Sequence, residues 1–80
     1  MITVEVRLYA TLREYHPDLG MGEPVVLALD DKAELGNLLD KLKLPKEEIK
    51  VAFVNGRSEA ESYLLQDGDR IGIFPPIGGG

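Results

Sequence analysis

The 80-residue chain contains no cysteine and no tryptophan, and its only histidine is His16. Without thiols, the chain cannot form a disulfide, catalyse a reaction through a thiolate or bind a metal through sulfur. A zinc site built around one histidine would need carboxylates for its other ligands, which is uncommon. No apolar run approaches the roughly 20 residues of a membrane span, and the N-terminus has no signal-peptide pattern. We therefore expect a cytoplasmic protein that binds no metal and no cofactor.

Basic residues are also in the minority. Nine lysines and arginines stand against 14 aspartates and glutamates, which gives a net charge of −5. We expect no nucleic-acid or membrane partner, because phosphate backbones and anionic lipids repel a negative chain. Partners with basic docking surfaces are favoured instead. The hydrophobic content of 44% is enough for a folded core, and 80 residues allow one small domain.

The hydrophobic pattern predicts several strands and one main helix. Ile2 to Leu8 alternates apolar and polar residues, as a strand with one solvated face does. The predicted elements, in chain order, are a strand over 2–8, a short helix within 9–15, a loop over 16–22, a strand over 25–29, the main helix from 31, a turn over 44–48, a strand over 50–54, a weak strand or helical turn over 58–65 and a closing strand over 70–74.

The main helix is expected to begin at Asp31. Its carboxylate would cap the first turn, with Glu34 three residues later completing a capping box. Four leucines at positions i, i+3, i+4 and i+7 then form one apolar stripe: Leu35, Leu38, Leu39 and Leu42. We expect this stripe to pack on the apolar residues of the first and last strands, namely Val4, Val6, Ile71 and Ile73.

This order of elements favours an α+β fold of the β-grasp, ubiquitin-like type. It would have a mixed sheet of four to five strands, with the helix across one face and the first and last strands parallel in the centre. The connection from the second strand through the helix to the third should be right-handed. Because one helix covers only one face, part of the other face should be apolar around Phe53 and Phe74. That patch would either dock a partner or be shielded by loops.

The C-terminal segment carries the strongest functional signal. After Phe74 the chain reads Pro75-Pro76-Ile77-Gly78-Gly79-Gly80. Proline cannot continue a sheet ladder, and the glycines have no side chains to pack. We therefore expect a folded domain over residues 1–74 and a flexible arm over residues 75–80. Extended at about 3.3 Å per residue, this arm would reach roughly 20 Å.

Other short motifs predict turns or loops. Asn55-Gly56 is typical of a tight turn, because both residues accept positive φ. Asp67-Gly68-Asp69 lacks the further ligands of a calcium loop, so we expect a turn there as well. Gly20-x-Gly22 lacks the third glycine and the strand-to-helix setting of a dinucleotide site. His16 has no partner nucleophile in any recognisable motif, so the chain carries no constellation for catalysis of its own.

Four segments together resemble the MoaD/ThiS family of ubiquitin-like sulfur carrier proteins. They are Val4 to Glu14, Val54-Asn55-Gly56, Leu65 to Asp69, and Phe74 to Gly80. The Phe-Pro-Pro approach to the terminal glycines is most similar to the small subunit of molybdopterin synthase. Gly78 departs from that pattern, because those subunits more often have Ala or another small residue there. The resemblance therefore leaves the receiving pathway open.

The resemblance implies a carrier, or co-substrate, that is not itself an enzyme. Gly80, with Gly79 beside it, would be adenylated by an E1-like adenylyltransferase of the MoeB/ThiF type that uses ATP and Mg²⁺. A sulfur donor such as a cysteine desulfurase would then convert the carboxylate to a thiocarboxylate. The acceptor would be the molybdopterin synthase large subunit (MoaE type), in molybdenum or tungsten cofactor biosynthesis. Partners would contact the apolar patch and the arm, through Phe53, Phe74, Pro75, Pro76, Ile77 and Gly78.

Three alternatives remain open at the level of the sequence. The recipient could be thiazole synthase in thiamine biosynthesis, with the same chemistry at Gly80. The protein could be a ubiquitin-like modifier, joined through Gly80 to lysines of its targets. It could also be a β-grasp binding module whose arm has no chemical role.

Overall fold

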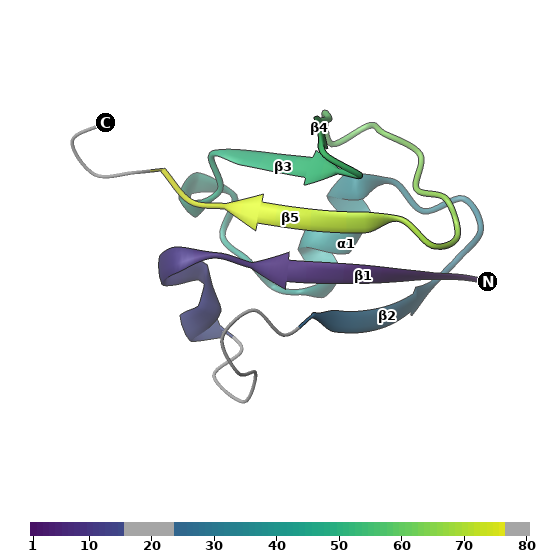
Figure 1. Cartoon of the computed structure of the whole chain (residues 1–80), viewed down its shortest axis with the longest axis horizontal. Coiled ribbons are helices and arrows are strands. Elements are labelled where there is room, and N and C mark those ends of the chain that lie inside the picture. The colour runs from purple at the N-terminus through teal and green to yellow at the C-terminus, as the bar shows by residue number, and fades with distance from the viewer. Residues whose placement is uncertain (16–23, 77–80) are drawn as a thin grey trace.

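The computed structural model describes residues 1–15 and 24–76 as a curved five-stranded sheet with one α-helix packed behind it (Figure 1). No helix in these two ranges is long and apolar enough to cross a membrane. The elements are β1 (Ile2–Leu8), the 3-10 helix η1 (Ala10–Tyr15), β2 (Val25–Leu29), α1 (Leu35–Lys41), the 3-10 helix η2 (Lys46–Glu48), β3 (Val51–Val54), β4 (Arg57–Ser58) and β5 (Arg70–Phe74).

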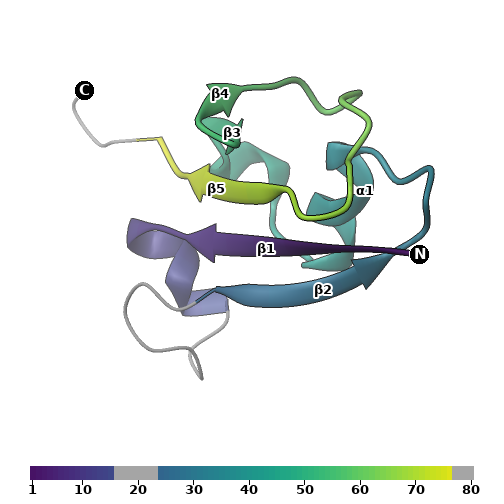
Figure 2. The ribbon, with the colours of Figure 1, turned by 45° about the vertical axis from the view of Figure 1, so that its right-hand side comes forward.

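The strand order confirms the predicted β-grasp fold. The order in the sheet is β2-β1-β5-β3-β4, so the first and last strands lie together in the centre. β1 and β5 are parallel, with Glu5 opposite Arg70 and Leu8 opposite Ile73. The β1–β2, β3–β5 and β3–β4 pairs are antiparallel. The chain passes from β2 to β3 through α1, which covers one face of the sheet (Figures 1 and 2).

The core lies between α1 and the sheet. All four leucines of the predicted stripe are buried, and Leu38 is fully inaccessible to solvent. They belong to one cluster with the inward residues of the central strands, as predicted: Val4, Val6, Ile71 and Ile73. Leu12 of η1 and Leu65 before β5 also belong to this cluster and are buried. Burying these side chains is the main source of stability, at about 1.5–3 kcal/mol for each large aliphatic side chain.

The predicted start of α1 at Asp31 is wrong, because the helix begins later. Glu34 is the N-cap, and it forms a capping box with Asn37, whose Oδ1 accepts the Glu34 N–H at 2.8 Å. Glu34 stays extended, at φ −100° and ψ 163°, because it forms a β-bridge with Leu64. Asp31 lies in the preceding turn, where its carboxylate is 2.7 Å from the N-terminal amino group of Met1. This ion pair raises the pKa of the amino group.

The predicted weak strand is short, because β4 covers only Arg57 and Ser58. The chain after β4 runs along the N-terminus of α1. The carbonyls of Glu61 and Tyr63 accept the N–H groups of Gly36 and Leu35, each at 2.8 Å. The first turn of a helix leaves such N–H groups without intrahelical partners, so the segment completes the helix end. Gly36 fits this close approach, since a Cβ there would lie 3.2 Å from a carboxylate oxygen of Glu61.

Candidate functional site

The face of the sheet opposite α1 carries the side chains that strand alternation directs outward. On β1 these include Glu5 and Arg7, and the same parity places Tyr9 on this face just beyond the end of the strand. The corresponding outward positions are Arg70, Gly72 and Phe74 on β5, and Val51 and Phe53 on β3. Several of these residues line one open groove, which has a volume of about 720 Å³.

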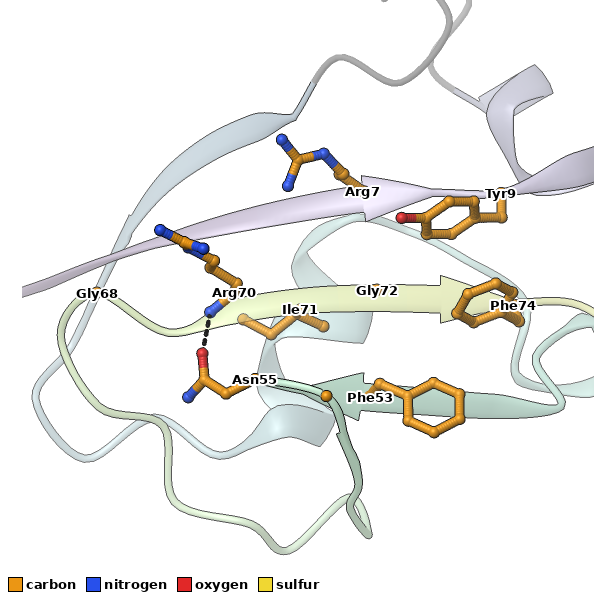
Figure 3. Close-up of a pocket in the computed structure, with 10 residues that line it drawn as sticks. Arg7, Tyr9, Phe53, Asn55, Gly68, Arg70, Ile71, Gly72 and Phe74 are labelled. Atoms are coloured by element: carbon orange, nitrogen blue, oxygen red, sulfur yellow. Dashed lines mark hydrogen bonds between the residues drawn. The ribbon is translucent and has the colours of Figure 1, made fainter.

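Three aromatic rings form a cluster at the C-terminal end of β5. The rings of Tyr9 and Phe74 are stacked, with centroids 4.3 Å apart and planes 2° from parallel. Phe53 meets Phe74 edge to face, at 5.6 Å and 89°. Figure 3 shows Phe74 between Tyr9 on one side and Phe53 on the other. We call Tyr9, Phe53 and Phe74 the aromatic cluster.

Gly72 makes room for the aromatic cluster. A Cβ built at Gly72 would lie 3.2 Å from Cε2 of Tyr9 and 3.5 Å from Cε1 of Phe74. The first distance is shorter than an ordinary van der Waals contact, so a side chain at this position would displace the tyrosine ring. The glycine in the middle of β5 therefore allows Tyr9 to lie across the strand and reach Phe74.

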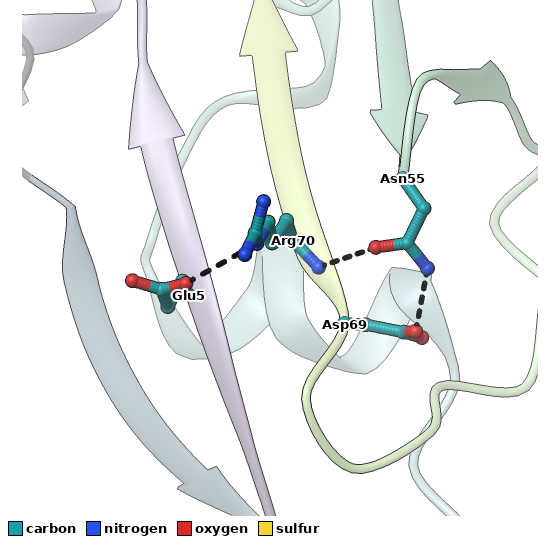
Figure 4. Close-up of polar contacts among 4 residues, drawn as sticks. All are labelled: Glu5, Asn55, Asp69 and Arg70. Atoms are coloured by element: carbon teal, nitrogen blue, oxygen red, sulfur yellow. Dashed lines mark hydrogen bonds and ion pairs between the residues drawn. The ribbon is translucent and has the colours of Figure 1, made fainter.

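The rest of the groove is polar and carries two arginines, Arg7 and Arg70. The Arg70 Nε atom lies 3.7 Å from a carboxylate oxygen of Glu5, directly opposite on β1 (Figure 4). Arg7 belongs to the same groove, nearer the aromatic cluster (Figure 3). The open face thus combines an apolar end at the C-terminal end of β5 with a polar end that carries two arginines, one of them paired with Glu5.

A buried carboxylate joins the two turns at the polar end. Asp69 is 5% exposed, and its two oxygens accept the side-chain amide of Asn55 and the backbone N–H of Gln66, each at 2.8 Å. The Asn55 Oδ1 atom in turn accepts the N–H of Arg70 at 3.0 Å (Figure 4). Burial of the Tyr63 phenol and the charge of Asp69 raise the pKa of Tyr63.

The structure confirms the predicted turns at both places. Asn55 and Gly56 have φ values of 52° and 86°, and Gly68 also has a φ of 86°. The Asp67 carboxylate accepts the N–H of Thr3 at 2.8 Å, so both aspartates of the Asp-Gly-Asp motif bind donors of the protein itself. Within residues 1–15 and 24–76, no group of three or more His, Cys, Asp or Glu side chains could hold a metal ion.

The residues predicted to bind a partner divide into two groups. Phe53 and Phe74 come together in the aromatic cluster, and both are half-buried. Of the two prolines that follow, Pro75 is buried and Pro76 is exposed, so only Pro76 offers its ring to a partner. The other predicted site residues, Ile77, Gly78, Gly79 and Gly80, lie outside the described residues. His16 and the Gly20-x-Gly22 motif lie outside them as well.

Sequence reasoning did not single out Tyr9 or Gly72. The signal for Tyr9 was its odd position in the sequence. Side chains of β1 point inward at even positions and outward at odd ones, so Tyr9 continues the outward series. The signal for Gly72 was weaker, since it is a glycine between two buried isoleucines in a strand. A strand glycine often marks a close approach, but the sequence does not say which side chain approaches.

A comparison with models of known protein families identifies the family of this chain. A family model described as Mut7-C ubiquitin matches residues 1–78. The chain belongs to this family. This match confirms the resemblance to ubiquitin-like proteins of the MoaD/ThiS type that the sequence motifs indicated. No curated protein matches the chain.

Solved structures similar to this Mut7-C ubiquitin family member come from archaea and bacteria. A putative molybdopterin converting factor subunit 1 from Pyrococcus furiosus has a TM-score of 0.78 at 22% identity, covering 96% of this chain and 100% of that one. Small archaeal modifier protein 1 from Methanosarcina acetivorans has a TM-score of 0.66 at 28% identity, covering 100% and 98%. A complex of subunits 1 and 2 of molybdopterin-converting factor from Helicobacter pylori has a TM-score of 0.63 at 25% identity, covering 99% and 100%.

Proposed function

We propose that this protein is a cytoplasmic sulfur carrier whose Gly80 carboxylate is adenylated and converted to a thiocarboxylate. The observation that carries the proposal is the position of the aromatic cluster on the open sheet face. The cluster contains Phe74, the residue from which the Pro-Pro-Ile-Gly-Gly-Gly arm begins. A docking surface at that place would bring the arm to a partner's active site. The protein acts as a co-substrate in this proposal, and the activating enzyme supplies the catalysis.

The chemistry follows from the properties of a carboxylate. At neutral pH it is anionic and has no good leaving group, so it resists nucleophiles. In the proposed first step, a carboxylate oxygen of Gly80 attacks the α-phosphorus of ATP on an E1-like adenylyltransferase with Mg²⁺, and pyrophosphate leaves. Hydrosulfide then attacks the carbonyl carbon and displaces AMP, which leaves the thiocarboxylate. If a cysteine desulfurase delivers a persulfide instead, a thiol must reduce the resulting acyl disulfide.

The residues of this chain contribute geometry to these steps. Glycine leaves the attacked carbonyl unobstructed and lets the arm enter a narrow channel. Ordering such an arm costs about 1–2 kcal/mol of backbone entropy per residue. Burial of the partly exposed aromatic cluster against the partner would offset part of this cost, at about 25 cal/mol per Å² of apolar surface. Proline at positions 75 and 76 lowers the cost further, because its φ is already fixed.

We propose the large subunit of molybdopterin synthase as the acceptor of the sulfur. The Helicobacter pylori structure, a complex of subunits 1 and 2 of molybdopterin-converting factor, supports this choice, because this chain is similar over 99% of its length. Thiazole synthase would use the same thiocarboxylate and is the alternative acceptor. The two acceptors can be separated by adding thiocarboxylated protein to each enzyme with its own precursor substrate and measuring sulfur transfer.

A second candidate function is conjugation to other proteins through Gly80. The similarity to small archaeal modifier protein 1 from Methanosarcina acetivorans favours it, at 28% identity over the whole chain. A modifier uses the same adenylate, but a lysine amine of the target displaces AMP in place of sulfur. The two functions therefore share the first step and differ in the nucleophile.

Mass spectrometry of protein from its native host tests these proposals. Intact mass first determines whether the mature protein ends at Gly80. An oxygen-to-sulfur exchange at that residue would support the carrier, and a Gly-Gly remnant on target lysines would support the modifier. An unmodified Gly80, together with no pyrophosphate exchange on the host's adenylyltransferase, would refute both.

Phe74→Asp tests the docking surface. We expect it to weaken binding to the activating enzyme, because a charge in an apolar interface loses its hydration without gaining a partner. The control is Val26→Asp, which places the same charge on β2 at the edge of the same sheet face, where Val26 is 61% exposed. Calorimetric affinities would be compared after thermal melts have confirmed folding. Wild-type affinity for Phe74→Asp would show that the partner docks elsewhere.

A further inference from the structure

Residues 73–75, near the end of the described chain, are fixed to the body of the protein at several points. The Phe74 carbonyl accepts the N–H of Lys50 from the β3 side at 2.8 Å. On the other side of β5, the Ile73 carbonyl accepts the N–H of Tyr9 at 3.2 Å. Pro75, the next residue after Phe74, is buried. The arm thus leaves the body from a root whose backbone is held by both neighbouring strands.

The side chain of Phe74 is held from both sides as well. Tyr9 comes from the end of β1 and lies flat against the Phe74 ring, while Phe53 comes from β3 and presents an edge (Figure 3). Aromatic pairs in these stacked and edge-to-face geometries attract each other beyond the effect of buried area. Rotation about the N–Cα bond of Phe74 would move its Cβ atom, so a fixed ring limits φ at the root. The hydrogen bond from Lys50 to the Phe74 carbonyl limits ψ.

We propose that Tyr9 is a positioning residue that sets the direction in which the arm leaves the body, and that Gly72 is required for this role. The proposal rests on the proposed function, in which the terminal carboxylate must reach the α-phosphate of ATP. Six residues follow Phe74 and span roughly 20 Å when extended. A rotation at Phe74 would therefore change the place and direction at which the arm enters a partner's channel. A misplacement of about 1 Å at the reacting atoms can cost 100-fold in rate.

A positioning role and a docking role make different kinetic predictions. Loss of a docking contact weakens ground-state and transition-state binding equally, so it raises KM and leaves kcat unchanged. Loss of positioning leaves the protein bound with the carboxylate misaligned, so it lowers kcat. Tyr9 is 36% exposed, so its ring has surface for a partner as well as the face that meets Phe74. Whether the variants change KM or kcat therefore decides between a docking role and a positioning role for Tyr9.

Three variants separate these effects. Tyr9→Phe keeps the stacked ring, and Tyr9→Ala removes it. Gly72→Val keeps the tyrosine but puts a branched side chain where a Cβ already meets Tyr9 at 3.2 Å. Valine is favourable in strands, so the fold should survive this change. The matched control is Ala28→Val, which also introduces valine, on β2 at an exposed position of the same sheet face away from the aromatic cluster.

The first readout needs no partner. Residual dipolar couplings of the Cα–Hα bonds of Phe74, Pro75 and Pro76 report the direction of the root relative to the sheet. We expect wild type, Tyr9→Phe and Ala28→Val to share one set of couplings. Tyr9→Ala and Gly72→Val should give a different, averaged set. Unchanged couplings in both of these variants would overturn the proposal, whether or not the protein carries sulfur.

The second readout is steady-state pyrophosphate exchange with the host's adenylyltransferase. We expect kcat to fall by about tenfold or more for Tyr9→Ala and Gly72→Val, with KM changed far less. Tyr9→Phe keeps the stacked ring, so it should restore most of the kcat that Tyr9→Ala loses. Ala28→Val should remain near wild type. A raised KM with wild-type kcat would make Tyr9 a docking residue and overturn the positioning role. If wild type itself shows no exchange, the proposed function fails, and the dipolar couplings still decide whether Tyr9 directs the root.

Discussion

Removing the buried carboxylate of Asp69 should destabilise the protein strongly, although the residue lies in a turn. Asp69→Ala removes the acceptor for the side-chain amide of Asn55 and for the N–H of Gln66, both now at 2.8 Å. Hydrogen bonds to a charged group contribute about 1.5–3 kcal/mol each, so these two together amount to about 3–6 kcal/mol. Asn55 and Gln66 are exposed, and water can replace part of the loss. We therefore expect a cost of roughly 2–4 kcal/mol.

This cost is large for a domain of 80 residues, whose total stability should be about 4–12 kcal/mol. At about 4–8 °C per kcal/mol, the melting temperature should fall by roughly 10–30 °C. The assay is urea unfolding followed by circular dichroism, with thermal melts as a second measure. Asp67→Ala is the matched control, because that exposed aspartate in the same motif accepts one hydrogen bond, from Thr3. It should cost about 1 kcal/mol or less.

A double-mutant cycle with Asn55→Gly identifies the interaction. Glycine accepts the positive φ of 52° at this position, so the substitution removes the side chain without adding backbone strain. If the Asn55–Asp69 hydrogen bond stabilises the turns as we infer, the coupling energy should be about 1 kcal/mol or more. A coupling energy near zero would refute the reasoning. So would an Asp69→Ala protein as stable as Asp67→Ala.

Three further predictions concern the core, the alkaline stability and the arm. Leu38→Ala should cost about 2–5 kcal/mol in urea unfolding, because this side chain is fully buried under the sheet; a loss well below this range would contradict its place in the core. The Tyr63 phenol has a pKa raised above the ordinary 10.0, so its stabilising contribution is complete below pH 10.0 and is lost as the pH rises through the higher folded value. Tyr63→Phe should therefore lose less stability than wild type in melts taken across that pH range. If the two proteins lose stability identically, the Tyr63 phenol does not contribute to the alkaline loss. Deleting Gly80 or adding one Ala after it changes the reach of the arm by about 3.3 Å. Both variants should melt like wild type, because the core is untouched, and lose nearly all adenylation, because the carboxylate is misplaced. Near-normal pyrophosphate exchange by the deletion would show that Gly79 can serve as the acceptor.

The local elements of this protein could be predicted from the sequence because each depends on a short pattern. The alternation from Ile2 to Leu8 sets which side of β1 is buried, and the leucine spacing sets the buried side of α1. Asn55-Gly56 accepts positive φ at both residues, so its turn follows from residue type alone. The chemistry proposed for Gly80 is also local, since it depends on a terminal carboxylate and on the absence of side chains around it.

Contacts between distant segments decided the rest, and no short pattern specifies them. The helix starts after Glu34 and not at Asp31, because the bridge to Leu64 keeps Glu34 extended, although Asp31 has a good capping sequence. The Asp-Gly-Asp turn gained a buried carboxylate because the sheet brings Asn55, the residue after β3, next to Asp69. The parallel pairing of β1 with β5 places Tyr9 beside Phe74, which follows it by 65 residues, and the absent side chain of Gly72 lets the two rings stack. Pairing between strands so far apart depends on the whole core being formed, and for that reason the aromatic cluster beside the arm could be seen only in the folded chain.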